Sequence, residues 1–300
     1  MKKITAMILL LAMVLALAAC SGGTNADDKN TDSSEDTYTI GVLYLDQEVL
    51  LSEATAGCQA YAAEHSNVKL IEYNANKDVS TQLKQCENLI SQNVDAIALT
   101  PVDGAGCDQI INACKDAGIP LICFHAKVNG APITNILFDN VGFGKMQVDY
   151  AMEIFEKNGG DMNGTINATI VDEQVGSWNR DDAMAIAENW ITSGRDIDII
   201  LSNNDAMAIG ISLAYANANV ERPIIIGVGG TEEGLTAILN GDFDGTVFQP
   251  AYQNGYDAID FTVKYLNGET LEESYVTEGV LVTPETAQAT LDDLNAMLNS

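Results

Sequence analysis

The chain alternates short apolar, β-branched runs with longer stretches in which apolar residues recur every three or four positions. The first pattern predicts buried strands and the second predicts amphipathic helices. In the first half, strands are predicted at 39–44, 68–73, 96–99 and 121–124, and the helix between the first two runs to Glu64. Asp78 is a good N-cap for the next helix, and Gly118 followed by Pro120 ends the one after it. This order indicates parallel βαβ units.

The alternation restarts after a strand predicted at 135–138. Further strands are predicted at 166–171, 197–201, 224–228 and 247–248, with helices at 143–155, 182–192, 206–217 and 232–239. Two such series indicate an α/β protein with two doubly wound, parallel-sheet lobes. Ligands of open parallel sheets bind beyond the carboxyl ends of the strands, so two facing lobes would form a cleft.

The amino-terminal segment has the features of an export signal. Lys2 and Lys3 precede an uncharged apolar run at 5–19, which suits a signal peptide and is short for a membrane span. The run ends in LAAC, which resembles the lipobox of bacterial lipoproteins, in which the cysteine (here Cys20) is lipidated. We expect a signal peptide at 1–19 and a lipidated, flexible tether at 20–37. An ordinary signal peptide with a chance cysteine is the alternative.

Charge and cysteine content exclude several classes of protein. The formal net charge of −29 repels phosphate backbones, which disfavours nucleic-acid binding. Five cysteines follow Cys20, and no two form a CxxC pair. Cys58, Cys86, Cys107 and Cys114 occupy positions where small apolar residues would pack. We therefore expect core cysteines, with no cofactor, no redox or metal chemistry and no disulfide framework.

The chain also lacks the sequence motifs of common enzymes. It has two histidines, His65 and His125, and it has no GxSxG, HExxH or Walker motif and no GxGxxG that opens a helix. The glycine-rich GVGGTEEG at 227–234 lacks the lysine of a phosphate-binding loop. We therefore expect no enzymatic activity. The oxygen-bearing Asp161, Asn163 and Asn167 leave a calcium site open as an alternative, although their spacing is short and only one is charged.

Five segments, in order, resemble type-1 periplasmic sugar-binding proteins, above all the ribose- and galactose-binding members that serve ABC transporters. They are QLKQCENLISQNVDAIALTPVD (82–103), AGIPLICFH (117–125), FDNVGFG (138–144), SNNDAMAIG (202–210) and NGDFDGTVFQP (240–250). The resemblance implies two Rossmann-like lobes joined by three hinge crossings, which close on a monosaccharide. It predicts an N-lobe at 38–138 plus 251–270 and a C-lobe at 139–250 plus 275–300, with hinges near 138–140 and 249–251.

The resemblance also implies ligand-binding residues. Asn204 and Gln249 match amides that bind sugar hydroxyls, and a planar amide can donate and accept at once. We expect Asp205, rather than Asn204, to cap the following helix. Trp178 matches an aromatic residue that stacks on the sugar ring. His125 stands where relatives carry Asp or Asn, which implies a ligand contact. A structural role, as a hydrogen-bonding residue of the fold, is an equally favoured alternative.

Weaker matches involve loop residues and hinges. Asp46, after the first strand, could bond a hydroxyl from the N-lobe. Asp139 and Asn140 match the first crossing and are expected to be hinge and cap residues.

The sequence departs from the family pattern at three places, two in the predicted C-lobe and one in the predicted N-lobe. The family's Gly-Val-Asp turn ends here in Gly229, and the segment at 45–51 lacks the usual N-lobe stacking ring. The third departure is at 165–176, where one strand fuses pieces that a loop, a helix and a strand separate in relatives. The C-lobe is therefore expected to be short by about one βα unit, which would uncover an apolar face.

The export signal and lipobox predict a lipid-anchored extracytoplasmic protein, and the family resemblance implies that it delivers a monosaccharide or similar polar solute to an ABC permease in the membrane. A ligand-sensing surface lipoprotein that signals to a membrane receptor, or a truncated relative that no longer binds, remains the alternative.

Overall fold

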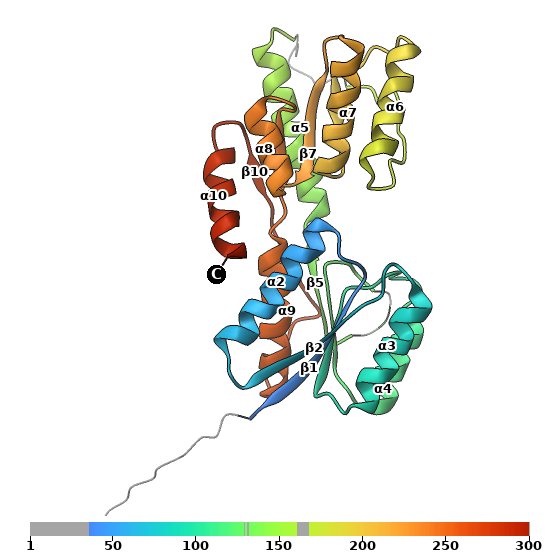
Figure 1. Cartoon of the computed structure of the whole chain (residues 1–300), viewed down its shortest axis with the longest axis vertical. Helices are drawn as coiled ribbons and strands as arrows, with labels where there is room; N and C mark the ends of the chain where they lie inside the picture. Colours follow the sequence, from blue (N-terminus) through green and yellow to red (C-terminus); the bar gives the residue numbers. More distant parts are fainter. Residues whose placement is uncertain (1–35, 129, 131, 161–167, 300) are drawn as a thin grey trace, which may run out of the picture. The chain divides into compact units, whose positions relative to one another are not determined.

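The computed structural model describes residues 36–128, 130, 132–160 and 168–299 (Figure 1). Among them, the strands of the first half and one late strand, β9, form a parallel sheet in the order β2-β1-β3-β4-β5-β9. Its strands are β1 (Tyr38–Tyr44), β2 (Val68–Asn74), β3 (Ala96–Leu99), β4 (Leu121–Phe124), β5 (Thr134–Phe138) and β9 (Ser274–Thr277). We call this sheet and its helices the N-lobe.

Both faces of the N-lobe sheet are covered by helices. One apolar cluster joins the sheet to α2 (Val49–Glu64) and α9 (Ala251–Leu266), and another joins it to α3 (Val79–Ser91) and α4 (Asp108–Ala117). Helices α2 and α9 approach closely because each has a glycine at the contact. A Cβ on Gly57 would lie 1.9 Å from the carbonyl oxygen of Tyr252, and one on Gly255 would lie 1.9 Å from that of Ala54.

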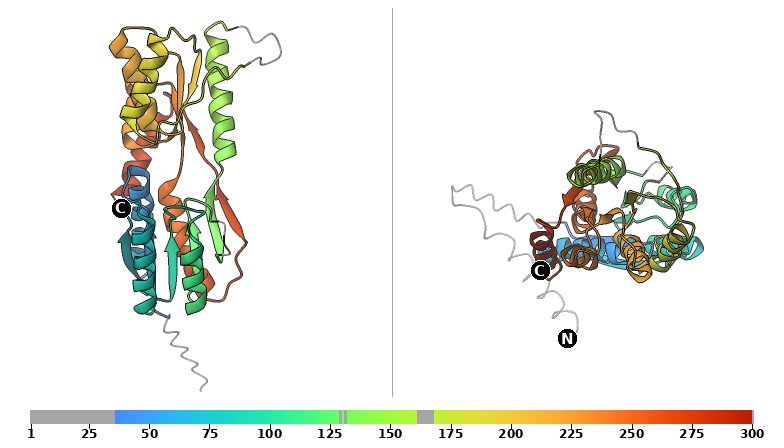
Figure 2. Two further views of the ribbon diagram at one scale, coloured as in Figure 1. Left: turned by 90° about the vertical axis from the view of Figure 1, so that its right-hand side faces the viewer. Right: turned by 90° about the horizontal axis from the view of Figure 1, so that it is seen from above.

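The second sheet has the order β10-β8-β7-β6 in the described part of the chain, with β10 antiparallel to β8. Its strands are β6 (Ile199–Leu201), β7 (Ile224–Gly229), β8 (Gly245–Phe248) and β10 (Val280–Val282). One core cluster joins it to α6 (Arg180–Thr192), α7 (Asp205–Ala218), α8 (Glu232–Asn240) and α10 (Ala287–Leu298). Helix α5 (Asn140–Lys157) packs against the opposite face (Figure 2). We call this unit the C-lobe.

The chain passes between the two sheets at three places, from β5 into α5, from β8 into α9 and from β9 to β10. At the first crossing, the Asp139 side chain caps α5 by accepting a 2.8 Å hydrogen bond from the backbone N–H of Gly142. Strand β9 pairs with β5 as far as Thr277, so the last crossing comes after that residue. The sequence predicts the return to the C-lobe at residue 275, but residues 275–277 belong to the N-lobe sheet, because they pair with β5.

Most predicted elements are confirmed, including β3 at its predicted residues and the Asp78 cap of α3. The strand predicted at 166–171 is wrong in its described part, because residues 168–171 form no strand. Residues 166 and 167 lie outside the described part of the chain. A strand needs a partner for its backbone groups, and β6 pairs only with β7 among the described residues. The apolar Ile170 is instead 85% exposed.

Candidate ligand-binding site

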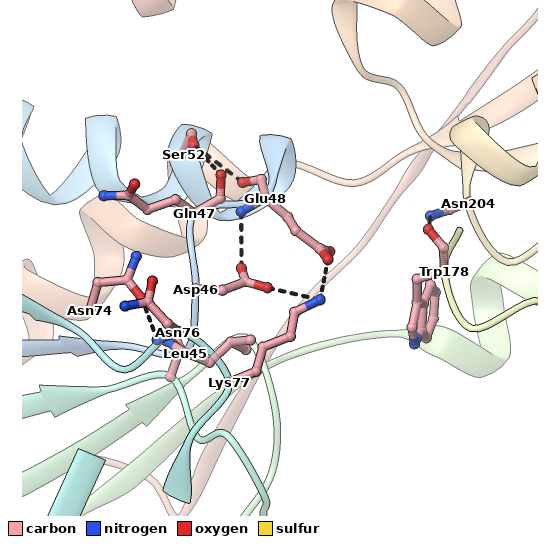
Figure 3. A network of polar contacts seen from close by, with 11 residues as sticks. Leu45, Asp46, Gln47, Glu48, Ser52, Asn74, Asn76, Lys77, Trp178 and Asn204 are labelled. Carbon is pink, nitrogen blue, oxygen red and sulfur yellow. Dashed lines mark hydrogen bonds and ion pairs between the residues drawn. The ribbon is translucent and has the colours of Figure 1, made fainter. Parts of the chain in front are cut away.

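Two loops of the N-lobe, after β1 and β2, bring three charged residues together (Figure 3). Asp46 is buried, and its Oδ1 accepts a 3.0 Å hydrogen bond from the backbone N–H of Glu48. The Nζ of Lys77 lies 3.2 Å from Oδ2 of Asp46 and also pairs with Glu48. Asp46 therefore lies at the carboxyl end of β1, as expected. Sequence reasoning missed Lys77 and Glu48, since an exposed ion pair between two loops leaves no periodic signal.

Lys77 is held by an unusual backbone. Asn76 and Lys77 both have positive φ angles, of 49° and 61°, a conformation that few residues other than glycine adopt. Hydrogen bonds fix it, from the backbone N–H of Lys77 to the carbonyl oxygen of Leu45 (2.8 Å) and from that of Asn76 to the Asn74 side chain (2.7 Å). The loop therefore presents the ammonium group next to Asp46.

His125 follows β4 at the same edge of the N-lobe sheet. Its backbone has a φ of 70°, and its N–H donates to the Asn254 side chain and to the carbonyl oxygen of Ile136, both at 3.0 Å. Burial lowers the pKa of His125 to about 4, although the charge of Asp46 opposes this effect, so the ring is neutral at pH 7. The buried Nδ1 has no hydrogen-bond partner among the described residues. A buried ring nitrogen of this kind is suited to a ligand hydroxyl.

In the C-lobe, Asn204 and Trp178 are linked directly. The Asn204 Nδ2 donates to the Trp178 carbonyl oxygen at 3.2 Å. Trp178 has a φ of 61° in a turn before α6, and it is 60% exposed. Figure 3 shows its ring beside Asn204, on the other side of the view from the Asp46 group. An exposed aromatic face is what stacking on a ligand requires.

The expected cap of α7 is wrong. Asn204, and not Asp205, is the N-cap, and its Oδ1 accepts a 2.8 Å hydrogen bond from the backbone N–H of Met207. The reason is backbone geometry, because Asn204 is extended (φ −150°, ψ 166°), as capping requires, whereas Asp205 already lies in the helix. Both ends of the Asn204 amide are thus engaged within the chain.

Asp205 has a different structural role, which sequence reasoning missed. Its buried carboxylate accepts hydrogen bonds from the backbone N–H of Gly230 (2.7 Å), that of Thr231 (2.9 Å) and the hydroxyl of Thr246 (2.6 Å). Burial raises the pKa of Asp205 to about 6, against the effect of these bonds. Its position also explains the absent acid in the β7 turn. A Cβ on Gly229 would lie 3.1 Å from the Asp205 Oδ2, and the φ of Gly229, +135°, is one that L-residues rarely adopt.

Gln249 lies at the second crossing, immediately after β8. Its backbone N–H donates to the carbonyl oxygen of Gly229 at 2.9 Å, which fixes the segment beside the β7 turn. Its side chain is half-buried and has no hydrogen bond to the described residues. The amide is therefore free to bind a ligand.

Glu53, on α2, is a buried acid that the helical pattern did not reveal. Its side-chain atom Oε2 has no hydrogen-bond partner within the described chain. Burial, and to a lesser extent the charge of Asp205, raises the pKa of Glu53 to about 8. Glu53 lies on an N-lobe helix, and its pKa is raised in part by the charge of Asp205 in the C-lobe.

A cavity of about 910 Å³ lies within the C-lobe, beside the free edge of β6. It is lined by α5, by the segment at 168–178, and by apolar residues of α6, β6 and α7, among them Trp190 and Met207. Trp190 Nε1 donates to Asp172 Oδ2 at 2.8 Å, which holds part of the segment in place. Its lining includes residues 168–176 of the region in which the sequence predicts a missing βα unit, and the missing unit itself stays a prediction.

Among the described residues, none of the helices combines the length and the hydropathy of a membrane-spanning segment. The same part of the chain contains no group of three or more His, Cys, Asp or Glu side chains that could hold a metal ion. The calcium alternative at Asp161, Asn163 and Asn167, and the lipidation predicted at Cys20, lie outside the described residues.

Comparison with known proteins places these features in a family. Residues 42–166 and 162–270 match the periplasmic binding protein domain. A xylitol-binding protein of Mycolicibacterium smegmatis is 29% identical over 94% of this chain and 84% of its own length. A ribose import binding protein of Bacillus subtilis is 24% identical, over 91% of this chain and 96% of its own.

A solved structure has the same fold. It is an ABC transporter solute-binding protein of Bacillus halodurans with bound myo-inositol, with a TM-score of 0.77 and 27% identity over 87% of this chain and 99% of that one. The alignment with the xylitol-binding protein runs over 305 positions, more than the 300 residues of this chain, so that relative has residues with no counterpart here.

Proposed function

Since this chain belongs to the periplasmic binding proteins of type 1, which bind sugars for ABC transporters, we propose that it is an extracytoplasmic lipoprotein that delivers a monosaccharide or similar polyol to an ABC permease. The observation that carries the proposal is His125. Its buried Nδ1 has no hydrogen-bond partner within the described part of the chain, and the ring lies near Asp46 at the carboxyl ends of β4 and β1. This edge of the sheet is where such folds bind ligands.

The ligand is proposed to be neutral and rich in hydroxyl groups. A neutral imidazole and the free amide of Gln249 can each donate and accept hydrogen bonds. The carboxylate of Asp46 accepts, and the ring of Trp178 offers an apolar face for one side of a sugar ring. Asn204 would contribute only if ligand binding displaced its bond to Trp178.

The proposed mechanism is closure of the lobes on the ligand. The ligand first meets the exposed Trp178 of the C-lobe, and the polar groups of the N-lobe complete its hydrogen bonds. Rotation is proposed to occur at the three crossings, at 138–140, 249–251 and 277–280, because each is a single chain segment. The permease then recognises the closed form, which the ligand stabilises by binding it more tightly than the open form.

A thermal-shift screen of the purified protein tests the binding function. Two relatives are named for xylitol and ribose, and the solved structure has myo-inositol bound, so sugar alcohols, pentoses and cyclitols lead the panel. Amino acids serve as the negative class. A ligand at 100 times its Kd should stabilise the folded state by about 2.7 kcal/mol. A cooperative unfolding transition that no polyol or sugar shifts would contradict the proposal and favour the truncated, non-binding alternative.

The lipid anchor is tested separately, in bacterial cells that produce the protein. Lipidation at Cys20 predicts that the protein fractionates with the membrane and that Cys20→Ser releases it in soluble form. A wild-type protein found only in the soluble fraction would contradict the anchor and leave the binding function untouched.

A further inference from the structure

Four cysteines of the N-lobe lie in one buried cluster, between the sheet and helices α3 and α4. They are Cys86, Cys107, Cys114 and Cys123. Cys58 lies on the other face of the sheet, where its thiol donates a hydrogen bond to the carbonyl oxygen of Gly255. The four clustered thiols thus share a compartment from which Cys58 is separated.

Two of the four sulfur atoms touch. The Sγ of Cys86, on α3, and the Sγ of Cys114, on α4, are 3.6 Å apart. Sulfur atoms in a disulfide are about 2.05 Å apart, so an approach of roughly 1.5 Å would join them. The two helices pack side by side on the same face of the sheet (Figure 1), and the contact between the two sulfur atoms shows that the side chains meet between them.

We propose that Cys86 and Cys114 form a disulfide that cross-links α3 to α4 when the chain folds in the presence of an oxidised thiol compound. One cysteine thiolate attacks a sulfur of the small disulfide, which forms a mixed disulfide and expels one thiol. The second cysteine then attacks the protein-bound sulfur, which forms the Cys86–Cys114 bond and expels the second thiol. Two electrons pass from the two cysteines to the small disulfide, and the two cysteine protons end on its two thiol products.

The disulfide is proposed to form while the chain folds, and not after the native state has been reached. Cys86 is 0% exposed and Cys114 is 1% exposed, so an oxidant cannot reach either sulfur in the native state. The hydrogen bond with Cys114, together with burial, raises the pKa of the Cys86 thiol, which disfavours the reactive thiolate. In the unfolded chain both thiols are accessible, and folding then brings the two sulfurs together.

The extracytoplasmic location under the proposed function would supply such an oxidant. The cross-link itself depends only on the chain, and it is tested without ligand or cell. Its failure is therefore distinguishable from a failure of solute binding.

The experiment refolds the purified full chain from denaturant, once with dithiothreitol and once with a mixture of oxidised and reduced glutathione. The protein is then unfolded in denaturant so that every free thiol is alkylated, and the peptides are mapped by mass spectrometry without reduction. The expected result is one peptide pair joined through Cys86 and Cys114, with Cys58 alkylated. Cys86→Ala and Cys114→Ala should each abolish the pair, whereas the matched control Cys58→Ala should keep it.

A second readout is thermal stability. The two cysteines are 28 positions apart in the chain, so the cross-link removes freedom from the unfolded state. The Tm of the oxidised protein should be higher by roughly 5–10 °C, and the shift should be absent from protein that is unfolded and refolded in dithiothreitol. The Cys58→Ala variant should show the same shift, and the Cys86→Ala variant should show none.

Three results would overturn the proposal. These are a native protein with both thiols alkylated after oxidative refolding, a glutathione adduct as the only oxidised product, and a cross-link that joins Cys107 to Cys123.

Discussion

The two lobes share one folding pattern but differ in how well their sheets are covered. In the N-lobe, two helices pack on each face, and residues such as Leu89 and Ile122 are fully buried. In the C-lobe, one face is covered by α5, and a cavity of about 910 Å³ opens beside β6. The difference shows that a βα pattern alone does not make a packed core, because each strand also needs a neighbouring strand and a helix over it.

The largest expected effect tests packing directly. Leu89→Ala in α3 removes a buried side chain and should lower the free energy of unfolding by about 2–5 kcal/mol. Ile170 is 85% exposed in the segment at 168–178 of the C-lobe, so Ile170→Ala should change the free energy of unfolding by no more than about 0.5 kcal/mol. Urea unfolding of both variants measures the contrast. Equal losses would mean that Ile170 is packed in solution and that the lobes do not differ as described.

The next prediction concerns the buried acid Glu53, whose pKa is raised mainly by burial and to a lesser extent by the charge of Asp205. The pKa of Glu53 is raised from its ordinary 4.5 to about 8, so its contribution to stability is complete below pH 4.5 and is lost as the pH rises to about 8. Glu53→Gln cannot ionise, and it should be more stable than the wild type at pH 8, on the order of 4 kcal/mol, but not at pH 4. Unfolding in urea across this pH range measures the difference.

The exposed Glu87 on α3 provides the matched control for that experiment. Glu87→Gln should leave the pH dependence of stability as it is in the wild type. If Glu53→Gln also left it unchanged, Glu53 would be ionised throughout, and burial would not control its protonation.

Trp178 distinguishes binding from stability in the C-lobe. Trp178→Ala should weaken ligand binding by about 1–3 kcal/mol, because a stacking aromatic face is lost. It should hardly change the free energy of unfolding, because the side chain is 60% exposed. Trp190→Phe, which removes the indole N–H bonded to Asp172, is the control that should leave binding intact. An unchanged affinity in Trp178→Ala would refute the stacking role.

The smallest expected effect concerns the cap of α7. Asn204→Ala should cost about 1 kcal/mol of stability, whereas Asn204→Asp keeps the oxygen that caps the helix and should cost less. Urea unfolding of both variants measures these losses. If both substitutions cost the same, the capping bond to Met207 would not explain the loss. If Asn204→Asp also binds ligand like the wild type, the Asn204 amide makes no ligand contact.

Local patterns in the sequence predicted most of the fold. The strand at 96–99 and the helix beginning after Asp78 were predictable because an apolar run or a capping residue specifies each one locally. The prediction of a strand at 166–171 was wrong in its described residues for the opposite reason. Its residues favour a strand, but whether a strand forms depends on a partner elsewhere in the chain.

The candidate site was predictable only in part. Asp46, His125 and Gln249 all follow strands, so their place at a sheet edge could be inferred. The choice between Asn204 and Asp205 as the cap depended on which residue is extended, and two adjacent polar residues do not reveal this. Glu53 and Lys77 were missed because burial on a helix and a positive φ in a loop are set by tertiary contacts.

Isothermal titration of a ligand found by the thermal-shift screen tests the central claim most directly, because it asks whether both lobes hold the ligand. Binding at one site per chain is predicted, with affinity reduced both by Asp46→Ala in the N-lobe and by Trp178→Ala in the C-lobe. Binding that neither substitution weakens, or that only one of them weakens, would contradict capture between the two lobes.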